Sequence, residues 1–372
     1  MDFAANDVVR TALRVEANAR VPPQPPHEAS LMNDVKRLRR EEASLPMYSS
    51  HRKNQKRIAR NADEDTERNW YRNMRGVLNE VDWEVCNATG FAALPTSTAS
   101  PFNFLDLGCC PGGFSSYILE KNPNAVGVGV SLPEGHRYLL PEESPDLTAR
   151  HTILWLDLVR LMLSSEPAHV AQLGTKSRLH LSAPPSILLQ PESFGLVVLD
   201  GHPLSVQRPE ENPENGVQLL GPRLLVSQLI IALTSVCTGG TLLVKLVGVQ
   251  RDDVQRVICM LDALSDTLVL CKPTTMFATQ DSFYVLARGI RDHGIAAGKM
   301  FTKAGILMDL RALWTQMTLG GSSRGSRWDF ICTQQEFLQY YRARYDVLTA
   351  PVLKVLCEAL KGKLNVERNG GL

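Results

Sequence analysis

The chain has 372 residues, of which 44% are hydrophobic and 21% are charged, and its formal net charge is +1. This length allows one large domain with extensions or two modest ones, and the near-zero charge excludes a polyelectrolyte that binds nucleic acid over its whole surface. The longest apolar run, residues 224–237, is too short and too polar to span a bilayer. Apart from one adjacent pair, the eight cysteines are scattered and form no CxxC motif, which indicates core residues in a reducing compartment.

The first 60 residues read as an N-terminal extension. Residues 1–20 predict a short helix, and a proline-rich linker follows over 21–30. Residues 31–60 contain nine Lys or Arg against three acids, which is typical of a solvated helix or tail, with an RNA contact as the sharper alternative. The N-terminus has no secretory hydrophobic region, and its acidic residues argue against a transit peptide. Cytoplasm or nucleus is expected by elimination, with mitochondria left open.

From residue 64 onward the pattern alternates between helices and strands. A helix is predicted over 64–86 because apolar side chains recur at helical spacing. Short, largely apolar strands are then expected, with helices between them over 112–122, 216–240 and 251–266; the strands cover 102–108, 125–132, 152–158, 194–201, 241–247, 267–273 and 282–289. Such strands suit a sheet that helices cover on both faces. The fold expected over residues 65–290 is therefore α/β: a doubly wound, mostly parallel, seven-stranded, Rossmann-like sheet.

After Gly289 the strand pattern stops, and residues 291–372 are expected to form a helical C-terminal extension. Its two apolar helical segments, 304–319 and 333–364, are joined by a glycine- and serine-rich hinge over 320–326. These helices could pack on the main domain or recruit a partner protein.

The stretch "DLGCCPGGF", residues 106–114, joins a strand to a helix through glycines, as ligand-binding turns at the carboxyl edge of a sheet do. A dinucleotide site would need G-x-G-x-x-G, but Cys110 occupies the second glycine position and Ser131, rather than an acid, ends the next strand. A purely structural turn stays open as an alternative. Two adjacent cysteines cannot supply a tetrahedral zinc site alone, so they are interpreted as packing residues and no metal is expected.

Three charged residues stand at or near the ends of later strands: Asp157 after the third, Asp200 at the end of the fourth and Lys245 inside the fifth. A lysine in an apolar strand is costly unless it is paired or functional, and Asp200 could pair with it. A structural ion pair, and a helix-capping role for Asp157, are the alternatives.

The motif D-x-G-x-x-P-G-G-[FW] resembles that of the FtsJ-like (RrmJ-type) ribose 2′-O-methyltransferases, which carry "DLGAAPGGW" here, and the resemblance covers roughly residues 65–290. It implies S-adenosyl-L-methionine as cofactor and an RNA substrate. The cofactor-binding positions that it implies are Asp106, Gly108, Cys109, Cys110, Pro111, Gly112, Gly113, Phe114, Ser131, Asp157 and Asp200.

The resemblance also implies a catalytic set, Lys-Asp-Lys-Glu, of which Asp200 and Lys245 match the two central members. The outer members differ. The helix before the turn offers Arg72 and Arg75 but no lysine, and arginine hardly acts as a base. Ser282 stands where the final glutamate belongs. The neighbouring Asp281 should point to the opposite face of the strand unless a bulge shifts the register, and Glu134 is a candidate for the acid missing at Ser131.

Two hypotheses follow from these residues. In the first, the chain is an active RNA ribose methyltransferase in which Lys245 draws away the hydroxyl proton or steers the oxygen, and Asp200 positions the amine. Arg72 and Ser282 then occupy the two outer positions. In the second, the chain is a catalytically weak or inactive methyltransferase fold that serves as an RNA- or protein-binding module.

Overall fold

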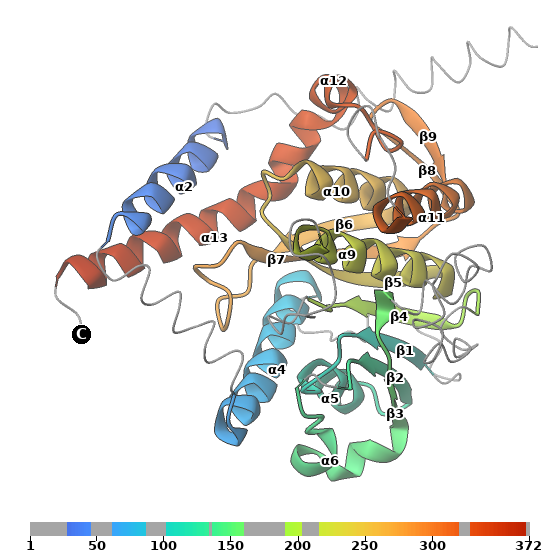
Figure 1. The fold of residues 1–372 in the computed structure, drawn as a ribbon. Helices are drawn as coiled ribbons and strands as arrows, with labels where there is room; N and C mark the ends of the chain where they lie inside the picture. Colours follow the sequence, from blue (N-terminus) through green and yellow to red (C-terminus); the bar gives the residue numbers. More distant parts are fainter. Residues whose placement is uncertain are drawn as a thin grey trace, which may run out of the picture.

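A computed structural model describes residues 28–45, 62–86, 102–133, 136–159, 190–202, 216–319 and 328–369. At its centre lies a seven-stranded sheet with the order β3-β2-β1-β4-β5-β7-β6 (Figure 1). The strands are β1 Phe102–Leu107, β2 Ala125–Ser131, β3 His151–Trp155, β4 Phe194–Leu199, β5 Val236–Val247, β6 Ser265–Cys271 and β7 Ser282–Ile290. All neighbours from β3 to β5 pair in parallel, and β7 is antiparallel to both β5 and β6. The expected doubly wound, mostly parallel sheet is therefore confirmed.

The strands send alternate side chains into two separate cores, as the period of a β-strand requires. In β1, Leu105 and Leu107 join the core built by α2, α9, α10, α11 and α13, whereas Phe104 joins the core built by α4 and α5. These helices span α2 Glu28–Ala43, α4 Glu64–Cys86, α5 Gly113–Lys121, α9 Gly216–Ser235, α10 Asp252–Leu264, α11 Lys303–Leu319 and α13 Arg342–Arg368. Short helical turns complete the chain: α6 Leu140–Glu143, a 3-10 turn Pro145–Arg150, α12 Gln334–Glu336 and a π turn Phe337–Tyr341.

The strand order reverses between β2-β1 and β4-β5, which is where α/β sheets bind ligands. Leu107 of β1 is in register with Leu199 of β4, and the Asp200 amide donates to the Leu107 carbonyl at 3.0 Å. The residues that follow the two strands therefore leave the sheet side by side.

The predicted end of the long helix before β5 is wrong. We expected a helix over 216–240 because glycines often end helices, but α9 ends at Ser235 and β5 begins at Val236. Val236 already pairs with Phe194, and the register shifts between Phe194 and Leu196 to admit the extra residues. Gly239 lies inside this irregular stretch with φ +79°, so the glycines serve the strand and not a helix end.

The expected end of the strand pattern at Gly289 is also wrong. Beyond it, β8 His293–Ala296 and β9 Lys299–Thr302 form an antiparallel hairpin. The two residues between them, Ala297 and Gly298, both have positive φ angles of 49° and 73°, as the tightest hairpin turns need. A side chain at Gly294 would collide with the Ala263 carbonyl, so this glycine lets the hairpin lie directly on α10.

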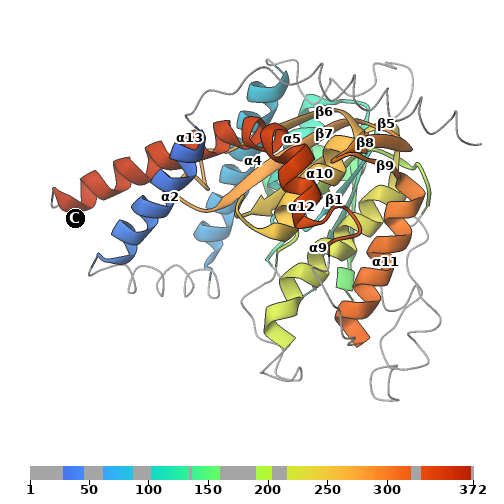
Figure 2. The same ribbon diagram turned by 90° about the horizontal axis from the view of Figure 1, so that it is seen from above.

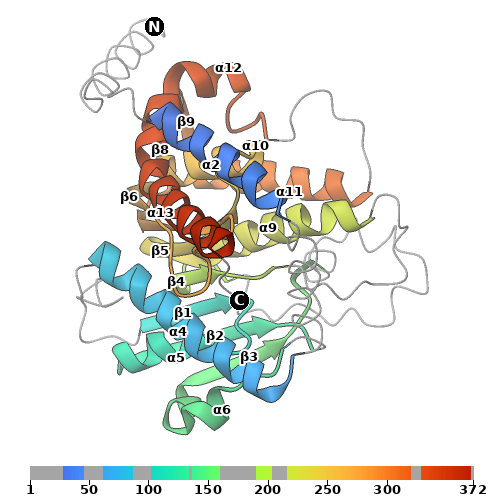
Figure 3. The same ribbon diagram turned by 90° about the vertical axis from the view of Figure 1, so that its left-hand side faces the viewer.

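The N- and C-terminal helices lie side by side: Figures 1, 2 and 3 all show α2 alongside α13. Between them the buried Glu42 accepts hydrogen bonds from Arg39 at 2.7 Å and from Lys363 at 2.8 Å. At its other end the C-terminal segment is tied to α10, because Tyr341 and Arg344 both donate to Asp262. The C-terminal helices thus pack on the domain.

Parts of the N-terminal expectation fall outside the described residues. These are the helix over 1–20, most of the proline-rich linker and the basic residues from 46 to 60. In the part of the chain that the structure describes, no helix has the length and apolarity to cross a membrane.

Trp314 tests the packing of α11 on α9. Its ring is 1% exposed and its indole N–H donates to Ser227 Oγ at 2.8 Å. Trp314→Ala should lower the free energy of unfolding by about 3–5 kcal/mol, because a large cavity opens and Ser227 loses its donor. Denaturant titration measures the loss. The control is Met308→Ala on the same helix, where the side chain is 68% exposed and the expected change stays below about 0.5 kcal/mol.

Candidate functional site

The turn after β1 holds two glycines in backbone conformations that other residues rarely adopt: Gly108 has φ +92° and Gly112 has φ +108°. At Gly108 a Cβ would lie 2.5 Å from the backbone of Gly201, so the turns after β1 and β4 touch there. This contact brings the residue before Gly201, Asp200, against the glycine turn.

The space beside the next two glycines is filled by protein. A Cβ at Gly112 would lie 3.3 Å from the Tyr138 ring, and one at Gly113 would collide with the Tyr71 carbonyl of α4. These glycines therefore allow Tyr138 and α4 to pack closely against the turn on these sides. The N-terminus of α5 still receives no side-chain cap from Gly112, and amides at such an end favour a ligand with acceptor atoms.

Asp106 is the buried acid of the turn. Its Oδ2 accepts a hydrogen bond from Ser115 at 2.7 Å, whereas its Oδ1 has no partner among the described residues. Burial raises the pKa of Asp106 to about 7, and the nearby charge of Asp200 adds to the rise, although the Ser115 bond opposes it. A buried carboxyl oxygen without a partner is rare in proteins and marks a place where a ligand donor fits.

The adjacent cysteines are both buried, and Cys109 packs where β2 has no side chain, against Gly129. The hydrogen bond between the two thiols is the main cause that raises the pKa of Cys109, and burial raises it further. The same bond lowers the pKa of Cys110. Ser131 at the end of β2 also hydrogen-bonds Cys110. The described residues contain no group of three side chains that could hold a metal ion.

Tyr138 and His151 form a wall beside the turn that the sequence did not reveal. Their rings stack at 5.6 Å, and the Tyr138 hydroxyl hydrogen-bonds the His151 ring. The next residue, Leu139, donates to the Pro111 carbonyl at 2.9 Å and fixes the wall to the turn. Burial lowers the pKa of His151 to about 4, so its ring is neutral at physiological pH. Glu134, the candidate replacement acid, lies outside the described residues.

Asp200 and Lys245 meet at this edge of the sheet, as their positions had suggested: Lys245 Nζ lies 3.2 Å from Asp200 Oδ1. Tyr284, which faces Lys245 in the β5–β7 register, donates its hydroxyl to the same oxygen at 2.8 Å. The Lys245 amine also lies 4.5 Å from the centre of the Phe277 ring. A carboxylate and a ring face thus both attract the cation, and the Lys245 side chain is 12% exposed.

Two of these neighbours, Tyr284 and Phe277, were not predicted as site residues. Tyr284 lies two residues beyond Ser282, so a register argument across β5 and β7 could have found it. An aromatic chain continues from it, since the rings of Phe277 and Phe114 lie 6.2 and 5.9 Å from the Tyr284 ring. Phe114, expected at the cofactor site, thereby connects the start of α5 to the residues around Lys245.

The loop that carries Phe277 is held by a second buried lysine. The Lys272 amine donates to the backbone carbonyls of Phe277, Gln280 and Ser282, and its side chain is buried. Burial lowers the pKa of Lys272 to about 7, against the opposing effect of Asp281. Sequence reasoning missed Lys272, although a lysine next to an apolar strand is the same signal that drew attention to Lys245.

The residues expected at the outer catalytic positions make no described contact with this pair. Arg72 is exposed on α4, and Ser282 is buried opposite Val247. The register of β7 contains no bulge, and Asp281 instead pairs with Arg39 of α2 at 2.6 Å. Asp281 is thereby engaged outside the Asp200–Lys245 site.

Two further candidates are tied to neighbouring elements. Arg75 hydrogen-bonds Ser116 and pairs with Glu120, both on α5. Asp157 Oδ1 accepts the Val159 amide at 3.0 Å, a bond typical of the helix-capping alternative.

One comparison with known proteins identifies a family. A model of the FtsJ-like methyltransferase family matches residues 89–290, more than half of the chain. The comparison with curated proteins gives no match.

Three of the similar solved structures illustrate the range. A Plasmodium falciparum protein described as a ribosomal RNA methyltransferase is 14% identical, with a TM-score of 0.31 over 51% of this chain and 87% of its own. A TehB-like SAM-dependent methyltransferase from Corynebacterium glutamicum is 12% identical, with a TM-score of 0.30 over 65% of this chain and 97% of its own. An O-methyltransferase family protein from Burkholderia thailandensis is 12% identical, with a TM-score of 0.35 over 62% of this chain and 61% of its own. Nothing about activity or substrate follows from likenesses at this level.

The raised pKa of Asp106 predicts a pH-dependent stability. Its carboxyl ionises near 3.9 in an unfolded chain and at about 7 in the fold. The stability that the neutral form contributes is therefore complete below about pH 4 and is lost as the pH rises through about 7. Asn stays neutral, so Asp106→Asn should gain melting temperature relative to the wild type between about pH 5 and about pH 8. Thermal unfolding without cofactor measures this, and a difference independent of pH would contradict it.

Proposed function

Because the chain belongs to the FtsJ-like methyltransferase family, we propose that it transfers a methyl group from S-adenosylmethionine to a ribose 2′-hydroxyl of RNA. The observation that carries this proposal is the ion pair of Asp200 and Lys245, 3.2 Å long, beside the glycine turn. These two residues match the central members of the family's catalytic set.

The glycine turn fits the cofactor of this family in three respects. The N-terminus of α5 lacks a side-chain cap, Asp106 Oδ1 has no partner among the described residues, and Asp200 brings a second carboxylate close by. When bound, S-adenosylmethionine supplies a methyl group on a positively charged sulfonium, which nearby carboxylates attract. The residues proposed to hold it are Asp106, Gly108, Gly112, Ser131 and Asp200.

The proposed work of Lys245 is to orient the acceptor hydroxyl. Its amine donates an N–H to the ribose oxygen and turns a lone pair toward the methyl group. As the new O–C bond forms, the bond from the methyl group to the sulfonium would break and leave a neutral thioether, and the hydroxyl proton would pass to the Asp200 carboxylate. Asp200, Tyr284 and Phe277 keep the amine in one position, and such positioning contributes a large part of the rate of a bimolecular transfer.

A second candidate function is an RNA- or protein-binding module with weak or no catalysis. It is favoured by the outer positions, where Arg72 is exposed and Ser282 replaces an acid without a described contact to the pair. The two candidates differ in one measurement, since a binding module takes up cofactor or RNA but transfers no methyl group to any RNA.

Gly112→Asp should abolish cofactor binding in a calorimetric titration with S-adenosylmethionine. The new side chain would crowd Tyr138, and its charge would sit at the start of α5. The matched control is Gly239→Asp, which has a comparable positive φ of +79° but no atom within 4 Å of the new Cβ. The control should bind as the wild type does. Equal binding by the Gly112 variant would remove the turn from the cofactor site.

Lys245→Ala should lower methyl transfer to RNA by at least about 100-fold, because an acceptor hydroxyl that is no longer held in place reacts about that much more slowly. Its affinity for S-adenosylmethionine should change by less than about threefold, because less than about 0.7 kcal/mol of cofactor contact is expected to be lost. Ribose-methyl mapping on total RNA treated with the purified protein measures transfer, and calorimetry measures cofactor binding. Undiminished transfer would reject the mechanism, and no transfer by the wild type would favour the binding module.

A further inference from the structure

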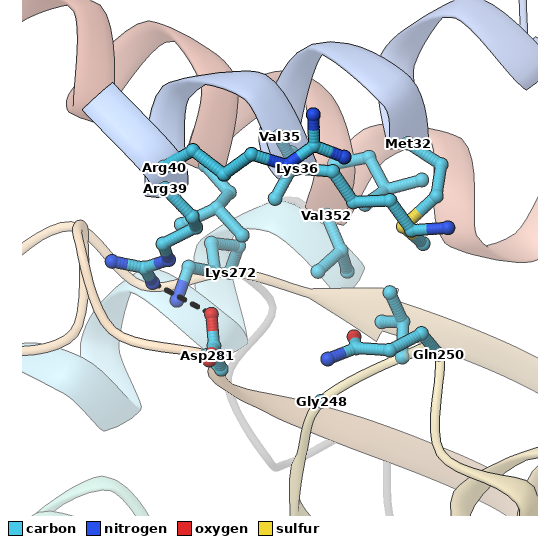
Figure 4. A pocket seen from close by; sticks show the side chains of 13 residues that line it. Met32, Val35, Lys36, Arg39, Arg40, Gly248, Gln250, Lys272, Asp281 and Val352 are labelled. Atoms are coloured by element: carbon cyan, nitrogen blue, oxygen red, sulfur yellow. Dashed lines mark hydrogen bonds and ion pairs between the residues drawn. The ribbon is translucent and has the colours of Figure 1, made fainter. Parts of the chain in front are cut away.

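A cavity of about 250 Å³ lies where α2 and α13 meet the loop after β5 (Figure 4). Figure 4 shows Lys36, Arg39 and Arg40 on the α2 side of the cavity, with Gln250 and Asp281 on the opposite side. Both helices of the wall lie outside residues 89–290, the part that the family model matches. The cavity therefore lies between this chain's extensions and the matched domain, which supplies Gly248, Val249, Gln250, Lys272 and Asp281.

The cavity lies at the same edge of the sheet as the proposed catalytic lysine but on the other face. Gly248, in its lining, directly follows β5 and comes three residues after Lys245, which is about 10 Å along an extended chain. The Lys245 amine contacts Phe277 on the side of α4 and α5, whereas the apolar lining belongs to the core of α2 and α13. Across the sheet, Asp281 directly precedes the first residue of β7, which pairs with the end of β5. One polymer strand is long enough to occupy both places.

Cations outnumber acids in the lining, where Lys36, Arg39, Arg40 and Lys272 stand against Asp281 alone. Two of these cations are engaged by protein. Arg39 binds Glu42, Asp281 and the Thr279 carbonyl, and Lys272 is surrounded by backbone carbonyls. Lys36 and Arg40 are different, because both are exposed and neither forms an ion pair with a described residue. They are available to an anion from outside.

The floor of the cavity is apolar. Val249, Val352 and Leu353 line it and belong to the buried core, while the side chain of Gln250 offers both a donor and an acceptor at the mouth. A ligand that suits this lining has a negative group, a flat or apolar part and polar edges. A nucleotide in an RNA strand combines all three.

We propose that this cavity binds a nucleotide of the RNA substrate that flanks the methylated one, with its phosphate on Lys36 and Arg40 and its base on the apolar floor. The inference rests on the proposed function and adds to it the place where the strand is anchored. An acidic peptide would pair with the cations, but it would not explain the apolar floor or the position of the cavity at the sheet edge that carries Lys245. RNA is therefore favoured.

The test is Lys36→Ala/Arg40→Ala, measured by fluorescence anisotropy with a labelled single-stranded RNA of mixed sequence, about 20 nucleotides long, at several salt concentrations. The double variant should bind about tenfold more weakly near 0.1 M salt, and its salt slope should fall by about 0.7, since each neutralised phosphate on a single strand contributes about 0.7. Affinity for S-adenosylmethionine, measured by calorimetry, should stay unchanged.

The matched control is Arg37→Ala/Lys354→Ala, which also removes one arginine and one lysine, here one from α2 and one from α13, outside the cavity lining. Arg37 is held by Asp34 and Glu41 instead, and Lys354 is exposed on α13. The control should bind RNA within about twofold of the wild type, because its residues lie outside the proposed contact. Equal weakening of both variants would reduce the effect to overall charge and overturn the inference.

The outcomes separate this inference from the proposed function. If the wild type binds and methylates RNA while the cavity variant binds equally well, the cavity is off the RNA path and the proposed function stands. If the wild type neither binds nor methylates RNA, the RNA assignment fails and takes the inference with it. If the cavity variant loses affinity for oligoglutamate but not for RNA, the cavity belongs to an acidic protein partner and the inference is overturned.

Discussion

A lysine inside an apolar β-strand has to be compensated, and the surroundings of Lys245 are arranged to do so. Asp200 reaches it because Gly108 and Gly201 let the turns after β1 and β4 touch. Tyr284 holds the same carboxyl oxygen, and the Phe277 ring covers the amine. The strand order with its reversal at β1 and β4, the glycines and the aromatic chain all serve to bring one carboxylate and one amine to the edge of the sheet.

The terminal helices are connected to the surroundings of Lys245 through the loop that carries Phe277. Lys272 holds the loop that carries Phe277, and Arg39 of α2 grips the same loop through Thr279 and Asp281. Asp281, which was considered for the last catalytic position, therefore binds the N-terminal helix α2 through Arg39. Since α2 is itself packed along α13 through Glu42, the two extensions are connected to the loop beside Lys245.

Local patterns were a good guide where neighbours along the chain decide the structure. The alternation of apolar strands and helices predicted all strands of the main sheet, and the spacing of Asp200 and Lys245 relative to strand ends predicted their meeting. The same reasoning failed at Gly239, because pairing with β4 extended β5 into glycines that resemble a helix end. It also failed at the β8–β9 hairpin, whose strands are only four residues long and whose turn lies on α10.

The sequence by itself determined the sheet, the glycine turn and the identity of the acid and lysine, since each is encoded by residues close together in the chain. Tertiary structure alone decided what fills the space around them. Tyr138 and His151 pack beside the turn, and Arg39 binds Asp281, which lies 242 residues further along the chain. Helices α2 and α13 line a basic cavity at the sheet edge that carries Lys245. Such contacts depend on how separate elements pack, and the spacing of residues within one element carries no information about that packing.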